Sequence, residues 1–140
     1  MAPIDLDEIE PGLVVFIDPA VLAADSRVSH TKDPPTPRPG PLVCVSVDGA
    51  TSEWMPITTE WRSEPLAIPR EWCSGGHPQW LRDAQYLQDG ANIWRGPHAV
   101  FVAASRQELT GRSDRARISE DGLAAIHREA ETQRQRRDRP

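Results

Sequence analysis

The sequence predicts one small, mainly β domain that ends in an α-helix. Fourteen prolines and five tryptophans stand against two phenylalanines, a composition that favours turn-rich β structure over a helix bundle. Short apolar runs alternate with turn residues along most of the chain, and the clearest helical pattern comes last. At 140 residues the chain has the size of a single domain. We therefore expect a small barrel or strongly coiled sheet of about five to seven strands, followed by a C-terminal helix.

The first strand is predicted over 13–17, where the apolar run Leu-Val-Val-Phe-Ile follows the turn residues Pro11-Gly12. A long connection, 18–41, comes next. Its residues 19–24 can form one helical turn, but five prolines over 34–41 remove ladder donors and favour polyproline II. A connection of this length is uncommon inside a compact domain and is usually functional or mobile.

The next two strands are predicted to form a tight hairpin. The apolar run 42–47 is followed by Asp48-Gly49, and glycine tolerates the positive φ that a two-residue turn needs. The returning strand covers 50–59. Pro56 within it cannot donate a ladder hydrogen bond, which implies an edge or a bulge at that point.

The segment after the hairpin holds shorter elements. We expect a strand over 66–68, which is bracketed by prolines. Residues 78–87 can form a short helix, or 86–94 can form a strand instead, and both interpretations stay open. Residues 98–104 are predicted as a strand. Capping-box spacing then predicts a short helix over 105–111.

The C-terminal helix has the most complete set of signals. Ser119 can cap it, acidic residues follow in the first turn, and Ile118 with Leu123 fits a hydrophobic staple. Its apolar stripe consists of Leu123, Ile126 and Ala130. We expect the folded domain to cover 1–132 and the polar tail 133–140 to fray.

Charge and cysteine content narrow the function classes. The net charge is −5, with five basic and twelve acidic side chains over 1–71 and eleven basic and nine acidic over 72–140. This balance gives no strong electrostatic footprint for nucleic acid. No apolar run approaches the roughly 20 residues of a membrane span, and the N-terminus is acidic where a signal peptide is basic. Since Cys44 and Cys73 stand in settings that suit free thiols, we expect a cytoplasmic protein without membrane contact.

Five segments occur in the order that a known family shows. They are a glycine and strand at 11–18, Arg-Pro followed by an apolar strand ending in serine at 37–46, a strand ending in paired threonines at 55–59, the stretch Gly-Ala-Asn-Ile-Trp at 90–94, and the helix from Ser119. In this order the chain resembles the MazF/PemK (Kid) toxin family over most of residues 11–130. The resemblance implies an SH3-like barrel with a C-terminal helix.

The resemblance also implies a homodimeric toxin that cleaves single-stranded RNA without metal or other cofactor and is held in check by an acidic antitoxin protein. In this reaction the RNA 2′-hydroxyl attacks the adjacent phosphorus, and negative charge builds up on the phosphoryl oxygens. An arginine neutralises that charge with a fork of donors, and a threonine hydroxyl hydrogen-bonds the same oxygens. These roles map to Arg38 and Thr58 as the catalytic pair. Thr59 and His30 are supporting residues, with His30 as a candidate general base.

Aromatic and arginine side chains supply the candidate binding surface. Five tryptophans exceed what a core of this size normally uses, so we expect two or three to be buried. The others can stack on bases or anchor a partner protein. The candidates for RNA or partner binding are Trp54, Trp61, Arg62, Trp94 and Arg95.

Metal chemistry is not expected. Cys73, His77 and His98 carry side chains that can bind a metal, but no CxxC or HxxxH spacing joins them. We therefore predict no metal site.

A second function class stays open beside the nuclease. In this alternative the chain is an SH3-like barrel without a catalytic site, and it binds a protein or nucleic-acid partner. Gly40-Pro41 stands where the family has apolar residues directly after Arg-Pro, and this departure favours the alternative. The negative net charge favours it as well.

Overall fold

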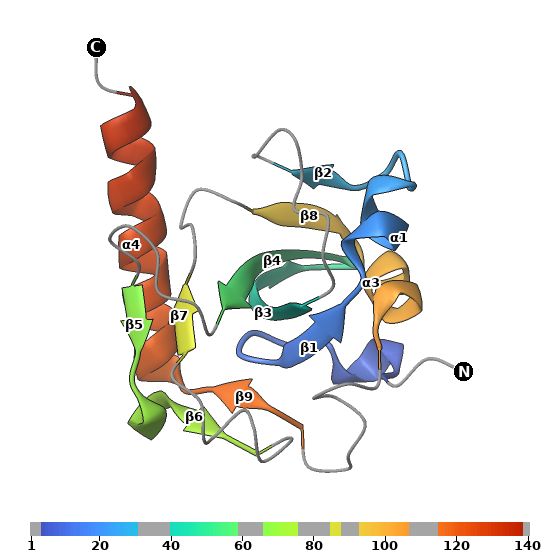
Figure 1. Ribbon diagram of the computed structural model, residues 1–140. Helices are drawn as coiled ribbons and strands as arrows, with labels where there is room; N and C mark the ends of the chain where they lie inside the picture. Colours follow the sequence, from blue (N-terminus) through green and yellow to red (C-terminus); the bar gives the residue numbers. More distant parts are fainter. Residues whose placement is uncertain are drawn as a thin grey trace.

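An antiparallel sheet forms the centre of the molecule, and helices pack on two of its sides (Figure 1). Helices α1 (Pro19–Ala23) and α3 (His98–Ala104) lie together on one side, and the C-terminal helix α4 (Glu120–Asp138) stands on the opposite side. This is the mainly β architecture with a terminal helix that the sequence predicts. No helix within the described residues is both long and apolar enough to cross a membrane. The computed structural model describes residues 4–30, 40–58, 66–75, 85–87, 93–106 and 115–138.

A long hairpin lies at the centre of the sheet. Strands β3 (Gly40–Asp48) and β4 (Thr51–Thr58) are joined at Gly49, whose φ of 61° is the positive value that the sequence predicts for this turn. The strand order along the main path is β1-β3-β4-β7-β5, β8 pairs with both β4 and β2, and β6 pairs with β9. The other strands are β1 (Val14–Ile17), β2 (Ser29–His30), β5 (Leu66–Ile68), β6 (Cys73–Ser74), β7 (Gln85–Leu87), β8 (Trp94–Pro97) and β9 (Arg117–Ile118).

Strand β4 changes neighbours part of the way along its length. Residues 51–54 pair with β8, and residues 57–58 pair with β7. Pro56 lies between the two pairings. On the side of β4 that faces β8 and β7, its missing N–H therefore costs no ladder hydrogen bond. Among the described strands only β3 pairs with β4 at Pro56, so this position is locally an edge, in agreement with the edge alternative of the prediction. The bulge of this hairpin lies in β3, where the register shifts between Cys44 and Ser46.

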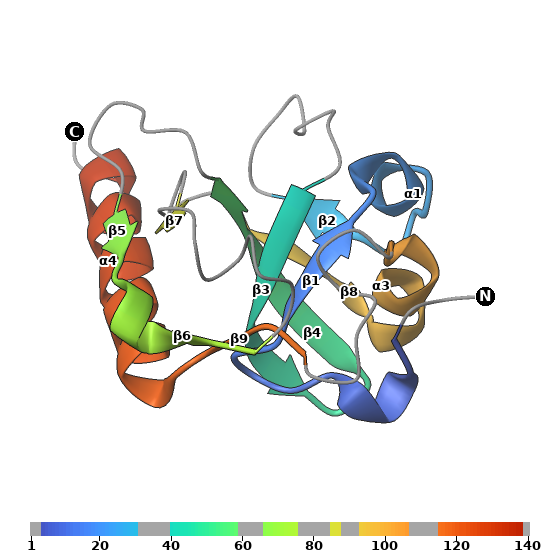
Figure 2. The ribbon, with the colours of Figure 1, turned by 60° about the horizontal axis from the view of Figure 1, so that its bottom comes forward.

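The sheet curls back on itself (Figure 2). Strand β9 continues along the outer edge of β1: Leu13 bridges to Arg117, and Ile118 donates its N–H to the Gly12 carbonyl oxygen at 2.8 Å. Strand β6 pairs with β9, and only Pro69 and the 3₁₀ turn η2 (Arg70–Trp72) separate β6 from β5. Hydrogen-bonded pairing therefore connects the strands in the order β5, β7, β4, β3, β1, β9 and β6. The chain itself links β6 back to β5, so the strands form a closed ring.

The turn predicted at Pro11-Gly12 makes this closure possible. Gly12 has a φ of 98°, which L side chains rarely adopt. A Cβ at this position would also lie 2.6 Å from the carbonyl oxygen of Ile118. Glycine is therefore required both by the backbone conformation and by the close approach of β9.

Both faces of the central strands are buried, in two separate clusters. One cluster includes side chains of α1 and α3 and is built around Trp54, Trp94 and Phe101. The other includes Met55 together with Ile126 of α4. Because alternate side chains of a strand point to opposite faces, β3 and β4 need apolar side chains at nearly every position in their middle. This explains the unbroken apolar runs in the sequence.

Residues 98–104 form helix α3 and not the predicted strand. The buried residues of α3 are Val100, Phe101 and Ala104, a spacing that places them on one helical face. In a strand, Val100 and Phe101 would point to opposite faces, and only one of them could join this cluster. Packing therefore overrides the β propensity of the valines and the phenylalanine.

Two other segments differ from the prediction. In the long connection, α1 occupies the predicted helical turn and is capped by Asp18, which accepts a hydrogen bond from the Ala20 N–H at 3.0 Å. The same connection also contains β2, which the sequence does not predict. Residues 85–87 form β7, so of the two open interpretations the helix over 78–87 is wrong at its end, and the strand from 86 is confirmed at 86–87. Most of that helix, and of the one predicted over 105–111, lies outside the described residues.

Helix α4 begins as predicted. The Ser119 hydroxyl oxygen accepts a hydrogen bond from the Gly122 N–H at 3.2 Å. The predicted stripe is the face that packs on the sheet: Leu123, Ile126 and Ala130. The helix extends over 133–138, the stretch for which the sequence predicts a frayed tail. Glutamine and arginine dominate this stretch, and both are good helix formers.

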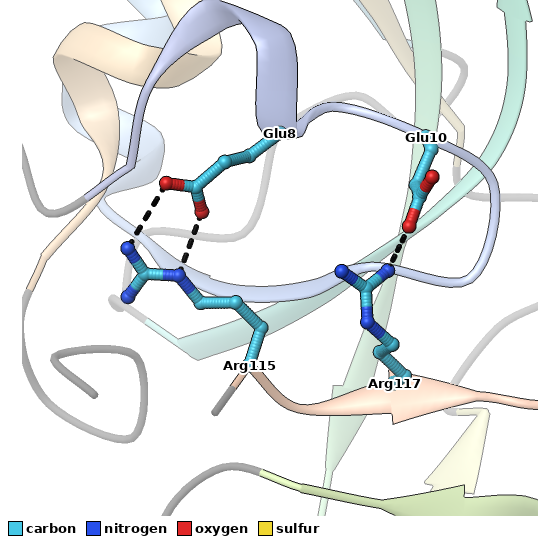
Figure 3. A network of polar contacts seen from close by, with 4 residues as sticks. All are labelled: Glu8, Glu10, Arg115 and Arg117. Carbon is cyan, nitrogen blue, oxygen red and sulfur yellow. Dashed lines mark hydrogen bonds and ion pairs between the residues drawn. The ribbon is translucent and has the colours of Figure 1, made fainter. Parts of the chain in front are cut away.

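Two carboxylate–guanidinium pairs fasten the N-terminal segment to the chain around β9 (Figure 3). Glu8, at the end of the 3₁₀ turn η1 (Leu6–Glu8), accepts hydrogen bonds of 2.6 and 3.1 Å from Arg115. Glu10 accepts one hydrogen bond from the guanidinium of Arg117. The hydrogen bonds and the charge of Arg115 hold the pKa of Glu8 below its usual value, although partial burial opposes this shift.

Gly122→Ala is expected to destabilise the fold by about 1–3 kcal/mol, the usual cost of overpacking. A Cβ here would lie 2.5 Å from Ile118 Cγ2 and 3.1 Å from Trp72 Cβ. Gly40→Ala is the matched control, because nothing lies within 4 Å of a Cβ built there. Urea titrations followed by circular dichroism give both free energies of unfolding. A Gly122→Ala protein as stable as the wild type would contradict the packing of Trp72 on α4.

Glu8→Gln is expected to lower the free energy of unfolding by about 1 kcal/mol at neutral pH, because charge-assisted hydrogen bonds are lost. The Glu8 and Arg115 side chains are only 25% and 16% exposed, so solvent screening is limited. Since folding lowers the pKa of Glu8, its stabilisation is complete above the usual glutamate pKa and is lost as the pH falls through the lowered value.

Thermal melts at neutral pH and at about pH 3 measure this effect. Asp7→Asn is the control, because Asp7 is an exposed neighbour on the same turn. A difference between wild type and Glu8→Gln that stays constant on acidification would show that the charge of Glu8 is not its cause.

Candidate functional site

The candidate site lies at the end of the sheet where β3 begins and β4 ends. The hairpin register pairs Leu42 with Pro56 and runs from there toward Gly40 and Thr58. Strand β3 begins at Gly40, so Gly40 and Pro41 are strand residues, paired with Ile17 and Phe16 of β1. The departure from the family pattern at Gly40-Pro41 therefore does not lengthen the connection between Arg38-Pro39 and the sheet.

Only part of the predicted catalytic set falls on the described residues. Thr58 is the last residue of β4, and its register partner is Tyr86 of β7. Arg38 and Thr59 lie outside the described residues, as do Trp61 and Arg62 of the predicted binding set. Arg38 precedes Gly40 by two positions in the sequence, and Thr59 follows Thr58 directly.

Tyr86 is a residue of this region that the sequence reasoning missed. It pairs with Thr58 on one side and with Ala67 of β5 on the other. Its neighbours Gln85 and Leu87 are buried, whereas Tyr86 is half-buried. The strand interpretation of 86–94 includes Tyr86, but neither it nor the helical interpretation of 78–87 places this residue beside Thr58. The signal that supports the strand is the single tyrosine of the chain, because tyrosine favours strands.

His30 lies on the same sheet at some distance from Thr58. In β2 it pairs with Trp94, and the two rings stand 5.0 Å apart at 48°. The register continues from Trp94 to Trp54 of β4, four residues before Thr58. At about 3.3 Å per residue this is roughly 13 Å along the strand, beyond hydrogen-bond reach. The described strands therefore do not bring His30 together with Thr58.

Trp54 and Trp94 are core residues, contrary to the binding role predicted for them. Their side chains are 0% and 1% exposed. Trp54 stacks on Phe101 of α3 with ring centroids 5.2 Å apart, and its indole N–H donates a hydrogen bond of 2.8 Å to the Ser52 hydroxyl. Helix α3, which the sequence analysis interprets as a strand, covers this region. Neither ring is available for stacking on a ligand.

Arg95 is exposed on the face of β8 opposite to Trp94. Its side chain is 52% exposed, and its guanidinium lies 3.9 Å from the Glu53 carboxylate. The Ser46 hydroxyl donates a hydrogen bond of 2.7 Å to the same carboxylate. Because successive strand residues point to opposite faces, Arg95 does not share a surface with His30. The three predicted binding residues that the structure describes, Trp54, Trp94 and Arg95, thus divide between two faces of the sheet.

The cysteines are placed as structural residues. Cys44 is fully buried in β3, and Cys73 is half-buried in β6. Burial raises the pKa of the Cys44 thiol to about 12 and that of the Cys73 thiol to about 11. Neither thiol is a ready nucleophile or metal ligand at neutral pH. Within the described ranges no three His, Cys, Asp or Glu side chains gather in a way that could hold a metal ion.

Comparisons of the chain with protein-family models, with curated proteins and with solved structures found no match. The function is therefore inferred from the residues of the chain and their arrangement. Two features of that arrangement bear on it: the common end of β3 and β4, and the half-buried Tyr86 beside Thr58.

Native protein is expected to react with iodoacetamide roughly 100-fold more slowly than a free thiol at about pH 8, because so little of either cysteine is thiolate. Mass spectrometry of the alkylated protein over time measures the rate at each residue. Unfolding in guanidinium should restore fast labelling of both. Rapid labelling of Cys73 in the native protein, lost in Cys73→Ser, would overturn its assignment as a structural thiol.

Proposed function

We propose that the protein is a metal-independent endoribonuclease that cleaves single-stranded RNA where β3 begins and β4 ends. The observation that carries the proposal is the start of β3 at Gly40, directly after Arg38-Pro39, in a hairpin whose register runs toward Thr58. The segment with the arginine enters the sheet, and the segment with the paired threonines leaves it, at one end of one hairpin. The fold also supports the proposal, because a mainly β domain with a terminal helix is what the family resemblance implies.

The proposed cleavage needs only groups of the chain and of the RNA. The 2′-oxygen attacks the neighbouring phosphorus and loses its proton to a base or to solvent. The bond from phosphorus to the 5′-oxygen of the next nucleotide breaks, and that oxygen takes up a proton. The products are a 2′,3′-cyclic phosphate and a 5′-hydroxyl. DNA lacks the attacking oxygen and is not a substrate.

Arg38 would stabilise the charge that develops on the phosphoryl oxygens, since a guanidinium offers two parallel donors to them. The hydroxyl of Thr58 or Thr59 would donate a further hydrogen bond to the same oxygens. His30 is given no part in this step, because the register separates it from the end of β4.

The biological setting proposed here is that of a cytoplasmic toxin, active as a homodimer and inhibited by an acidic antitoxin. Its support is the order of the five segments that carry the family resemblance. An acidic partner would compete with RNA for Arg38, because a carboxylate and a phosphate both match the donor geometry of a guanidinium.

A barrel that binds a partner without cleaving RNA is the second candidate function. Two observations favour it. Trp54 and Trp94 are withdrawn into the core, and Arg95 is paired with Glu53, so these groups add little aromatic or cationic surface for RNA.

Purified protein is expected to cleave single-stranded RNA in the presence of EDTA, and Arg38→Ala is expected to lower the rate by about 100-fold or more. Arg38→Lys should retain part of the activity, because the charge remains while the fork of donors is lost. Arg128→Ala is the matched control, since it removes one exposed arginine from α4.

Gel analysis of labelled RNA measures the rate, and mass spectrometry identifies the cyclic phosphate ends. Failure of the wild-type protein to cleave a varied set of RNAs would reject the nuclease and favour the binding barrel. Equal losses in Arg38→Ala and Arg128→Ala would reject Arg38 as the catalytic arginine.

A further inference from the structure

The side chain of Tyr86 lies on the face of β7 opposite to the cluster beneath α4. Strand neighbours point to opposite faces, and the residues on either side of Tyr86 are buried: Gln85 is 5% exposed and Leu87 is 1% exposed. Leu87 belongs to the cluster beneath α4. Tyr86 therefore points away from this core and is half-buried.

The two register partners of Tyr86 are small residues, and one of them belongs to the proposed site. On β5 its register partner is Ala67, which is exposed and carries only a methyl group. On β4 its register partner is Thr58, next to the proposed point of cleavage. Trp54 and Trp94 are buried, so those two cannot serve an RNA bound here. A tyrosine with one side in the protein and the other toward solvent is typical of residues that stack on ligands.

We propose that the Tyr86 ring is a stacking platform for one base of the single-stranded RNA whose phosphate lies at the end of β4. This inference rests on the proposed function, since it assigns the neighbouring base of the same substrate. Single-stranded RNA is recognised largely by unstacked bases that pack on aromatic side chains. Stacking on a ring is tolerant of sequence, because every base has a π-face. Tyr86 thus contributes to RNA binding and takes no part in the bond-breaking step.

The first test measures binding without cleavage. The probe is a fluorescent 2′-O-methyl RNA oligonucleotide, which lacks the attacking hydroxyl and stays intact. Tyr86→Leu keeps an apolar side chain but has no π-face, and it should raise the Kd by about 10-fold or more. Tyr86→Phe keeps the ring and should bind within about twofold of the wild type. Leu6→Ala is the control, because it shortens an exposed apolar side chain on η1.

The second test separates binding from chemistry with a cleavable RNA. Tyr86→Leu should raise KM and leave kcat unchanged, because a stack present before and during the reaction contributes equally to both states. Thermal melts establish that both Tyr86 variants fold. Should Tyr86→Leu bind as tightly as the wild type, or Tyr86→Phe lose as much affinity as Tyr86→Leu, the platform is rejected.

The two proposals fail in different ways. If the wild type binds the probe through Tyr86 but cleaves no RNA, the nuclease is rejected and the platform stands. If RNA is cleaved with Arg38 required but without any effect of Tyr86→Leu on KM, the nuclease stands and the platform is rejected.

Discussion

The antiparallel pairing of β3 with β4 is the constraint on which the other elements depend. β1 pairs with β3, and β7 and β8 pair with successive halves of β4. The alternating side chains of β3 and β4 contribute to both buried clusters, with Cys44 and Trp54 on one face and Val43 and Met55 on the other. Neither the α1–α3 layer nor α4 would have a surface to pack on without this hairpin. The hairpin register also sets which residues meet at the candidate site.

The sequence predicted those elements whose causes are local. Turn chemistry at Gly49, flanking prolines around 66–68 and capping by Ser119 all depend on residues close in the chain, and the structure contains each element. Strand β2 has two residues and forms only because β8 lies beside it, so no local sequence pattern predicts it. Helix α3 was missed for the same reason, because its buried face is selected by contact with distant side chains such as Trp54.

For the candidate site, too, features with local causes could be predicted and features that depend on distant contacts could not. The hairpin turn, which the sequence identifies, brings the start of β3 to the end of β4, but the bulge between Cys44 and Ser46, which the sequence does not predict, shifts the register by one residue toward Thr58. The count of tryptophans indicated that some are buried but could not say which, since burial of Trp54 and Trp94 depends on the layer that covers them. Tyr86 falls in the alternative strand predicted from 86, but no local pattern shows that this strand lies between β4 and β5, so the position of Tyr86 beside Thr58 was not predicted.

The contact between β9 and the edge of β1 has a consequence for how the chain folds during synthesis. The hairpin of β3 and β4 joins residues close in sequence, whereas the ion pair of Glu8 with Arg115 spans 107 positions. Contacts of such separation form slowly, because a long segment must first be ordered. During synthesis on the ribosome, the N-terminal part of the free edge of β1 stays uncovered until β9 has emerged. Until then it offers unpaired backbone groups to neighbouring nascent chains.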